Sequence, residues 1–153
     1  MYVSFHSAIG ASVALSLFPG NWPLAFLAGW FGHYLADAIP HGDDASPELL
    51  ADRRRLVRRA AAWGAGDLAV LGTLTVWWTV RHGFSPTLAA AVIGSSLPDL
   101  MWGLEAVLNR SLFGWFARFH KLIHNPLKIQ LPLWFGLSYQ LVGAGLLWWR
   151  LLI

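Results

Sequence analysis

The chain has no cysteine and little charge. The absence of cysteine excludes disulfides, thiolate metal sites and a cysteine nucleophile, so any bound metal must be held by nitrogen and oxygen atoms. Charged residues make up 12% of the 153 residues, against about 25% in a typical soluble domain. Such a low charge density leaves too little polar surface to cover a globule that faces water on all sides.

Apolar residues make up 56% of the chain, and the length indicates a single domain over residues 1–153. The apolar residues form five segments separated by turn-forming residues, at 3–18, 23–40, 60–80, 86–108 and 131–153. A helix needs roughly 20 apolar residues to cross a bilayer, with a range of about 17–25, so only the first segment is short. Strands are disfavoured because an open sheet edge cannot face lipid. We therefore predict an all-α integral membrane bundle of about five transmembrane helices.

Small residues recur in these segments and predict close contacts between helix backbones. They are Gly64, Gly66, Gly72, Gly94, Ser95, Ser96, Gly143 and Gly145.

Two polar connections link the apolar segments, at 41–59 and 109–130. The first contains five arginines and a helix-start pattern, Ser46-Pro47-Glu48, which predicts a short surface helix. The second alternates aromatic residues with cations, which predicts an amphipathic helix lying in the membrane interface. Nine of the eleven Lys and Arg residues lie in these connections. The positive-inside rule then predicts a multi-pass protein of the inner membrane, with a cytoplasmic N-terminus. Membrane lipid is the expected partner, nucleic acid is not, and the oligomeric state stays open.

Five of the six histidines converge on the cytoplasmic side in this topology, although they are spread along the chain. Ionisable residues inside membrane spans are costly and are therefore candidates for a functional role. His33 and Asp37 are four residues apart, as are His120 and His124, and residues at this spacing share one helix face. Imidazole and carboxylate are common zinc ligands. The predicted metal ligands are His6, His33, Asp37, His41, Asp99, His120 and His124.

Further residues are weaker candidates for the same site. Asp43, Asp67 and Glu105 could add carboxylates, although Asp43 could equally pair with nearby arginines and the other two could pack helices. Arg118 and Lys121 are predicted to meet a substrate phosphate. His82 falls on the opposite face of the membrane and is excluded from the site.

Three motifs carry a resemblance to a known family: His6-Ser-Ala-Ile-Gly10, the HxxxDxxPHxD block over 33–43, and Gly94-Ser-Ser-Leu-Pro-Asp99. Together they resemble the small prokaryotic membrane-bound metal-dependent hydrolases. The segment His33-Tyr-Leu-Ala-Asp37 with His41 is also distantly similar to zinc-dependent phospholipase C and related single-strand nucleases, which are all-helical. That likeness implies that His33 and Asp37 bind metal and that Asp99 bridges metals or acts as a base. The chain departs from it by lacking an N-terminal Trp ligand and by carrying HxxxH at His120.

The leading hypothesis is a membrane-embedded hydrolase of phosphoesters, such as a phospholipid or another amphiphilic phosphoester. One to three zinc ions, or manganese instead, would activate a water, with Asp99 and Asp37 as the catalytic carboxylates. The rival hypotheses are a structural metal site that ties the helices together and a small transporter of metal or protons.

Overall fold

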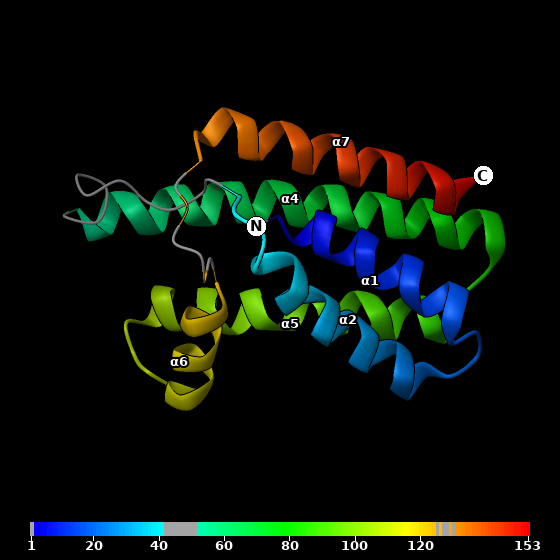
Figure 1. Ribbon diagram of the computed structural model, residues 1–153, viewed down its shortest axis with the longest axis horizontal. Coiled ribbons are helices and arrows are strands. Elements are labelled where there is room, and N and C mark those ends of the chain that lie inside the picture. The colour runs from blue at the N-terminus through cyan, green and yellow to red at the C-terminus, as the bar shows by residue number, and fades with distance from the viewer. Residues whose placement is uncertain (1, 42–51, 125, 127–128, 130) are drawn as a thin grey trace.

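The computed structural model describes residues 2–41, 52–124, 126, 129 and 131–153. These ranges contain helices and no strand, so the predicted all-α class is confirmed. The helices are α1 (Val3–Leu17), α2 (Trp22–Asp37), α4 (Arg53–His82), α5 (Pro86–Leu108), α6 (Gly114–Ile123) and α7 (Leu133–Leu152) (Figure 1).

The helix ends follow from capping residues in the sequence. The side chain of Asn21 accepts a hydrogen bond from Leu24 N at the start of α2, and Ser85 accepts one from Leu88 N at the start of α5. Both caps satisfy backbone N–H groups that have no partner within the helix. Asn109 ends α5 in the left-handed conformation, with a φ of 53°, which asparagine tolerates better than most residues.

The arginines of the first polar connection belong to α4, whereas the sequence predicted a separate short surface helix and a long helix that begins near residue 60. α4 begins at Arg53, seven residues before the predicted start at residue 60, so the arginine run forms its first two turns. Asp52 caps this start by accepting a hydrogen bond from Arg55 N, and arginine itself favours helix. The short helix predicted from Ser46, and Asp43 with it, lie outside the described residues.

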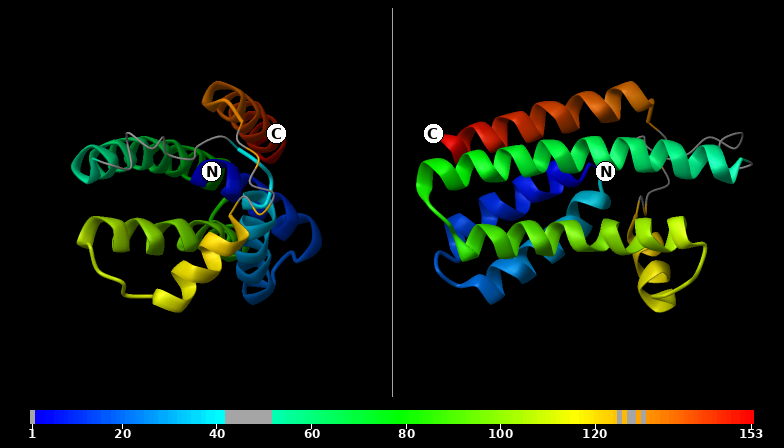
Figure 2. Two further views of the ribbon diagram at one scale, coloured as in Figure 1. Left: turned by 60° about the vertical axis from the view of Figure 1, so that its left-hand side comes forward. Right: turned by 180° about the vertical axis from the view of Figure 1, so that it is seen from behind.

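The second polar connection contains the predicted amphipathic helix, α6. Phe116 and His120 are buried on one face, whereas Arg118 and Lys121 are exposed. The buried face packs against α2, and α6 lies beside α2 and α5, away from α4 and α7 (Figure 2).

α1 is the central helix and contacts each of the other four long helices. α4 and α7 lie on one side of it, and α2 and α5 on the other (Figures 1 and 2). Successive long helices run in alternating directions. The start of α1 and the end of α2 therefore lie close to the middle of α5, and α6 covers this point from the side.

Small residues bring α2 and α5 into backbone contact. A Cβ atom at Gly29 would overlap the carbonyl oxygen of Ala91, and one at Gly94 would overlap the carbonyl oxygen of Phe26. The predicted packing role is thus confirmed for Gly94. At four other glycines an added Cβ would meet no atom within 4 Å, so the predicted packing role is wrong for them within this chain. They are Gly64, Gly66, Gly72 and Gly145.

Among the described residues, one helical stretch is long and apolar enough to cross a membrane, Pro86–Glu105 in α5. α1 and α2 are apolar but have only 15 and 16 residues. α4 and α7 are longer, but their aliphatic residues are interspersed with glycine, tryptophan and polar residues. Length and composition of this kind are shared by core helices of soluble proteins. The arrangement of five spans therefore stays a prediction.

Substituting alanine at Gly94 should separate α2 from α5. We expect Gly94→Ala to cost about 1–3 kcal/mol of unfolding free energy, because the methyl group would overlap a backbone carbonyl that cannot move alone. Gly72→Ala is the matched control, since its site is open, and it should be neutral or stabilising by up to about 1 kcal/mol. Thermal unfolding of both purified variants measures the difference. Equal unfolding midpoints would contradict the close contact.

Candidate metal centre

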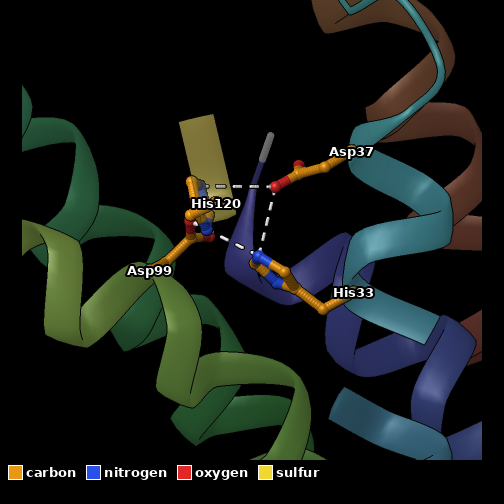
Figure 3. Close-up of side chains that lie close together, drawn as sticks. All are labelled: His33, Asp37, Asp99 and His120. Atoms are coloured by element: carbon orange, nitrogen blue, oxygen red, sulfur yellow. Dashed lines mark ion pairs between the residues drawn. The ribbon is translucent and has the colours of Figure 1, made fainter. Parts of the chain in front are cut away.

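The centre of the site is a His–Asp pair on α2. His33 and Asp37 are one helical turn apart, so their side chains project from the same face. His33 Nε2 lies 3.1 Å from Asp37 Oδ2, and both side chains are almost fully buried. Figure 3 shows the two residues turned toward Asp99 and His120, which come from α5 and α6.

Three further side chains reach this pair from three different helices. His6 Nε2 of α1 lies 3.1 Å from Asp37 Oδ1 and 4.0 Å from Asp99 Oδ2. His120 Nε2 of α6 lies 3.6 Å from Asp37 Oδ2. Asp99 Oδ1 lies 3.9 Å from His33 Nε2. The predicted convergence of these five residues is confirmed.

A second group adjoins the first and shares Asp37 with it. His41 lies just beyond the end of α2, and its Nε2 atom is 3.0 Å from Nε2 of His124. Ligand atoms of Asp37, His41 and His124 all lie within 4.8 Å of one another, as do those of the group His33, Asp37, Asp99 and His120. Asp37 is therefore the common member of two candidate ligand sets.

Hydrogen bonds to backbone carbonyls orient two of the imidazoles. His33 Nδ1 lies 2.9 Å from Ser95 O, and His41 Nδ1 lies 2.8 Å from Ile39 O. Because a carbonyl oxygen can only accept, each Nδ1 must carry the proton, and in the neutral ring Nε2 then presents a lone pair. Both lone pairs point into the cluster, which is how metal-binding histidines are commonly held.

The distances between these donor atoms fit a shared metal ion. Four ligands held tetrahedrally at about 2.0–2.1 Å from zinc lie about 3.3 Å from one another. The distances from an imidazole Nε2 atom to the nearer carboxylate oxygen of Asp37 are 3.1, 3.1 and 3.6 Å, for His6, His33 and His120. Four buried nitrogen atoms make no hydrogen bond within the described residues: His6 Nδ1, His6 Nε2, His33 Nε2 and His120 Nδ1. Because buried polar atoms without partners are costly, a cation bound by Nε2 of His33 would remove such a cost. The buried cluster could therefore hold a metal ion.

His120 is held in the form that binds metal. Burial lowers the pKa of its imidazole to about 4, even though the nearby Asp37 carboxylate favours the protonated ring. The neutral ring therefore predominates near pH 7, and only the neutral ring has a lone pair to donate.

Two of the additional candidates have other roles. Asp67 accepts hydrogen bonds from the backbone N and the hydroxyl of Ser4, so it joins α4 to the start of α1. Glu105 accepts a hydrogen bond from Phe113 N and so ties the end of α5 to the start of α6. Neither belongs to a candidate ligand group. Each is a packing residue, the alternative that the sequence had left open.

The predicted phosphate-binding cations have no contact with the cluster among the described residues. Lys121 is exposed, and Arg118 Nε donates a hydrogen bond to Gly114 O within α6. Arg118 precedes His120 on α6 and Lys121 follows it, so both lie near the site without entering it.

Sequence reasoning missed the residues that support the cluster from α5 and α7. Ser95 positions His33 through its carbonyl, a contact that no side-chain pattern can reveal. Gln140 of α7 is buried, accepts a hydrogen bond from Tyr2 N and donates to His41 O at 3.5 Å. Its position in the middle of an apolar segment was the signal that could have identified it.

A scan against protein-family models, a search of curated proteins and a search of solved structures each found no match for this chain. The resemblance to membrane-bound metal-dependent hydrolases therefore stays a prediction.

Removing a cluster histidine should empty the metal position that it helps to form. We expect His33→Ala to bind at most about half of the metal bound by the unmodified protein, because loss of an oriented ligand typically weakens a site severely and the group Asp37, His41 and His124 is left intact. His82→Ala is the matched control and should keep all of the metal, since His82 lies at the far end of α4 and stacks on Trp78. Elemental analysis of the purified, metal-loaded proteins gives the content. Equal metal loss in both variants would contradict the assignment.

Proposed function

We propose that the chain is a multi-pass membrane protein that hydrolyses phosphoesters at a centre of two divalent metal ions, zinc or manganese. The observation that carries this proposal is the sharing of Asp37 between two sets of ligand atoms. One ion would be held by His33, Asp37, Asp99 and His120, with His6 beside them. The other would be held by Asp37 with His41 and His124.

This arrangement suits phosphoester hydrolysis. Two metal ions held about 3.5–4 Å apart bind a phosphoryl oxygen, lower the pKa of a water and stabilise the leaving oxygen. Asp37 would be the ligand common to both ions, because it offers a ligand atom within 4.8 Å of those of His33, Asp99 and His120 and one within 4.8 Å of those of His41 and His124. The imidazoles of His33 and His41 hold their positions through backbone hydrogen bonds, which preorganises these two ligands.

Asp99 is the residue that we assign to handling the proton of the attacking water. Its side chain is 21% exposed, whereas that of Asp37 is 1% exposed. A catalytic metal site keeps one position open to water or substrate, and the partly exposed ligand marks the side on which that opening lies. A carboxylate at the opening can orient the water and accept its proton.

The surface and the charges support a membrane location. Large apolar side chains are exposed on all five long helices, for example Leu17, Leu35, Val80, Ile93 and Leu146. The exposed cations Arg54, Arg55, Arg118 and Lys121 lie on the helix ends nearest the cluster. Asp99 lies about 20 Å along α5 from Pro86, at 1.5 Å per residue, in a hydrocarbon core of about 30 Å. These features favour a cluster close to the cytoplasmic leaflet, with a cytoplasmic N-terminus.

A metal site that only staples helices is the alternative that shares this geometry. A structural zinc is closed by four protein ligands, whereas the group Asp37, His41 and His124 offers three and would leave one position open to water, which favours catalysis. A transporter would need a polar path to the other end of the bundle. Among the described residues, the far helix ends carry His82, Arg81 and Arg150 but no Asp or Glu.

Replacing Asp99 by asparagine should separate catalysis from stability. We expect Asp99→Asn to lower kcat for a phosphomonoester by about 10²–10⁴-fold, the usual contribution of a general base, with little change in the unfolding midpoint. Asp67→Asn is the matched control: it should lower the unfolding midpoint through its lost contacts with Ser4 and leave kcat unchanged. Phosphate release and thermal unfolding measure the two effects. A structural staple would instead lose stability in Asp99→Asn, and activity that survives complete chelation would contradict the mechanism.

Removing His124 should empty one of the two metal positions. We expect His124→Ala to reduce the bound metal from two ions per chain to one, because His33, Asp99 and His120 still hold the other ion. Elemental analysis gives the stoichiometry, and anomalous scattering at the zinc edge locates the remaining ion. Retention of two ions would exclude His124 as a ligand, and loss of both would show that the two groups act as a single site.

A further inference from the structure

An apolar groove lies between α2 and α6, next to the metal centre. It has a volume of about 300 Å³ and is lined by Phe31, Tyr34, Leu35, Ala38, Phe119 and Ile123. Phe31 and Leu35 leave 64% and 73% of their surface exposed, so the groove is open along its outer side. Its lining contains no charged residue.

The floor of the groove is also a wall of the metal centre. The ring of Tyr34 packs against those of His33 and His120, with centroid distances of 5.3 and 5.9 Å. On the groove side Tyr34 packs against Phe119, at 5.2 Å. The groove therefore ends beside the ligand cluster, separated from it by the thickness of one aromatic ring.

Chain neighbours connect the two sites as well. Ala38 follows Asp37 directly, and Ile123 precedes His124. A molecule that lies in the groove and extends past Ala38 and Ile123 would thus place the atoms beyond its apolar part beside Asp37 and His124.

The shape and the chemistry of the groove define its occupant. Ligand sites typically measure about 300–1,000 Å³, so this groove is at the small end of the range. An α-helix of a partner protein is about 10–12 Å across with its side chains, which is more than a groove of about 300 Å³ can enclose. A single hydrocarbon chain fits, and a lining without charge excludes a polar head group.

We infer that this groove binds one acyl chain of a phospholipid and places the phosphoester of that lipid at the metal centre. The substrate class is then a glycerophospholipid that enters sideways from the bilayer between α2 and α6. Leu35, Phe31 and Ile123 determine specificity for the chain, because they form the open edge of the groove. This inference rests on the proposed hydrolase and names its substrate.

Filling the groove should discriminate between lipid and soluble substrates. Leu35→Trp adds bulk at the groove edge, and we expect it to lower kcat/KM for a dioleoyl phospholipid at least tenfold while leaving that for p-nitrophenyl phosphate within about twofold. Leu24→Trp is the matched control: Leu24 lies on the same helix, is also exposed and is about 16 Å away. It should leave both activities unchanged. Equal losses in the two variants, or an equal loss on both substrates in Leu35→Trp, would overturn the inference.

Photo-crosslinking tests binding without requiring turnover. The full chain is placed in nanodiscs that contain a phosphatidylcholine with a diazirine in its acyl chain, and the labelled residues are located by mass spectrometry. We expect label to concentrate on 31–38 and 119–123, and to fall there by at least half in Leu35→Trp but not in Leu24→Trp. Label spread evenly over the exposed helix faces, or preference for a polyprenyl phosphate over the acyl lipid in competition, would overturn the inference.

The two readouts separate failure of the groove from failure of the proposed function. If no phosphoester is hydrolysed at any metal loading, the hydrolase proposal fails, and concentrated label would still support acyl-chain binding. If hydrolysis depends on metal but neither label nor chain dependence points to the groove, the hydrolase proposal stands and the acyl-chain inference is overturned.

Discussion

The structure depends on the buried carboxylate of Asp37 and on what compensates its charge. Three imidazoles surround it, from His6, His33 and His120, and the carboxylate is 1% exposed. A buried charge costs several kcal/mol unless opposite charge or good hydrogen bonds are close by. Neutral imidazole rings that present lone pairs cannot supply that charge, and burial favours the neutral ring at His120. A shared cation would balance the carboxylate and occupy the lone pairs together.

Close helix packing is what allows these groups to meet. Gly29 and Gly94 let the backbones of α2 and α5 touch. This contact carries the Ser95 carbonyl to within 2.9 Å of His33 Nδ1, which then sets the direction of Nε2. α1 lies against both helices and delivers His6. The geometry of the cluster and the packing of the core are therefore coupled, and a change in either one should disturb the other.

The position of the cluster links its chemistry to the surroundings of the protein. The ligands lie toward the end of the bundle that carries most of the cations, and an uncharged groove leads from the exposed side of α2 to the same point. In the membrane location that we propose, polar head groups and hydrocarbon chains meet at such a boundary. A phosphoester attached to a lipid chain would thus find a compatible environment at both of its ends.

Local pattern was sufficient to predict most of the helices and the two pairs of candidate ligands. The apolar segments correspond to α1, α2, α5 and α7 within a few residues, and the spacing of four at His33–Asp37 and His120–His124 reports a shared helix face. Both are short-range properties, because helix formation and facing depend on residues within one or two turns. The early start of α4 was missed, because its arginines were assigned to a polar connection.

Tertiary structure decided which helix faces meet, and no local sequence pattern contains this information. Asp67 and Glu105 had the same residue chemistry as Asp37 and Asp99, yet they contact Ser4 and Phe113 instead of the cluster. Glycines that look alike in the sequence differ in the structure: Gly94 lies in a tight helix contact, whereas Gly72 faces open space. The sharing of Asp37 between two ligand groups arises from the docking of α6 across the end of α2. The sequence by itself thus determined most of the helices and the kind of candidate ligand that they carry. The assembly of those ligands depended on long-range packing, in which every helix constrains its neighbours at once.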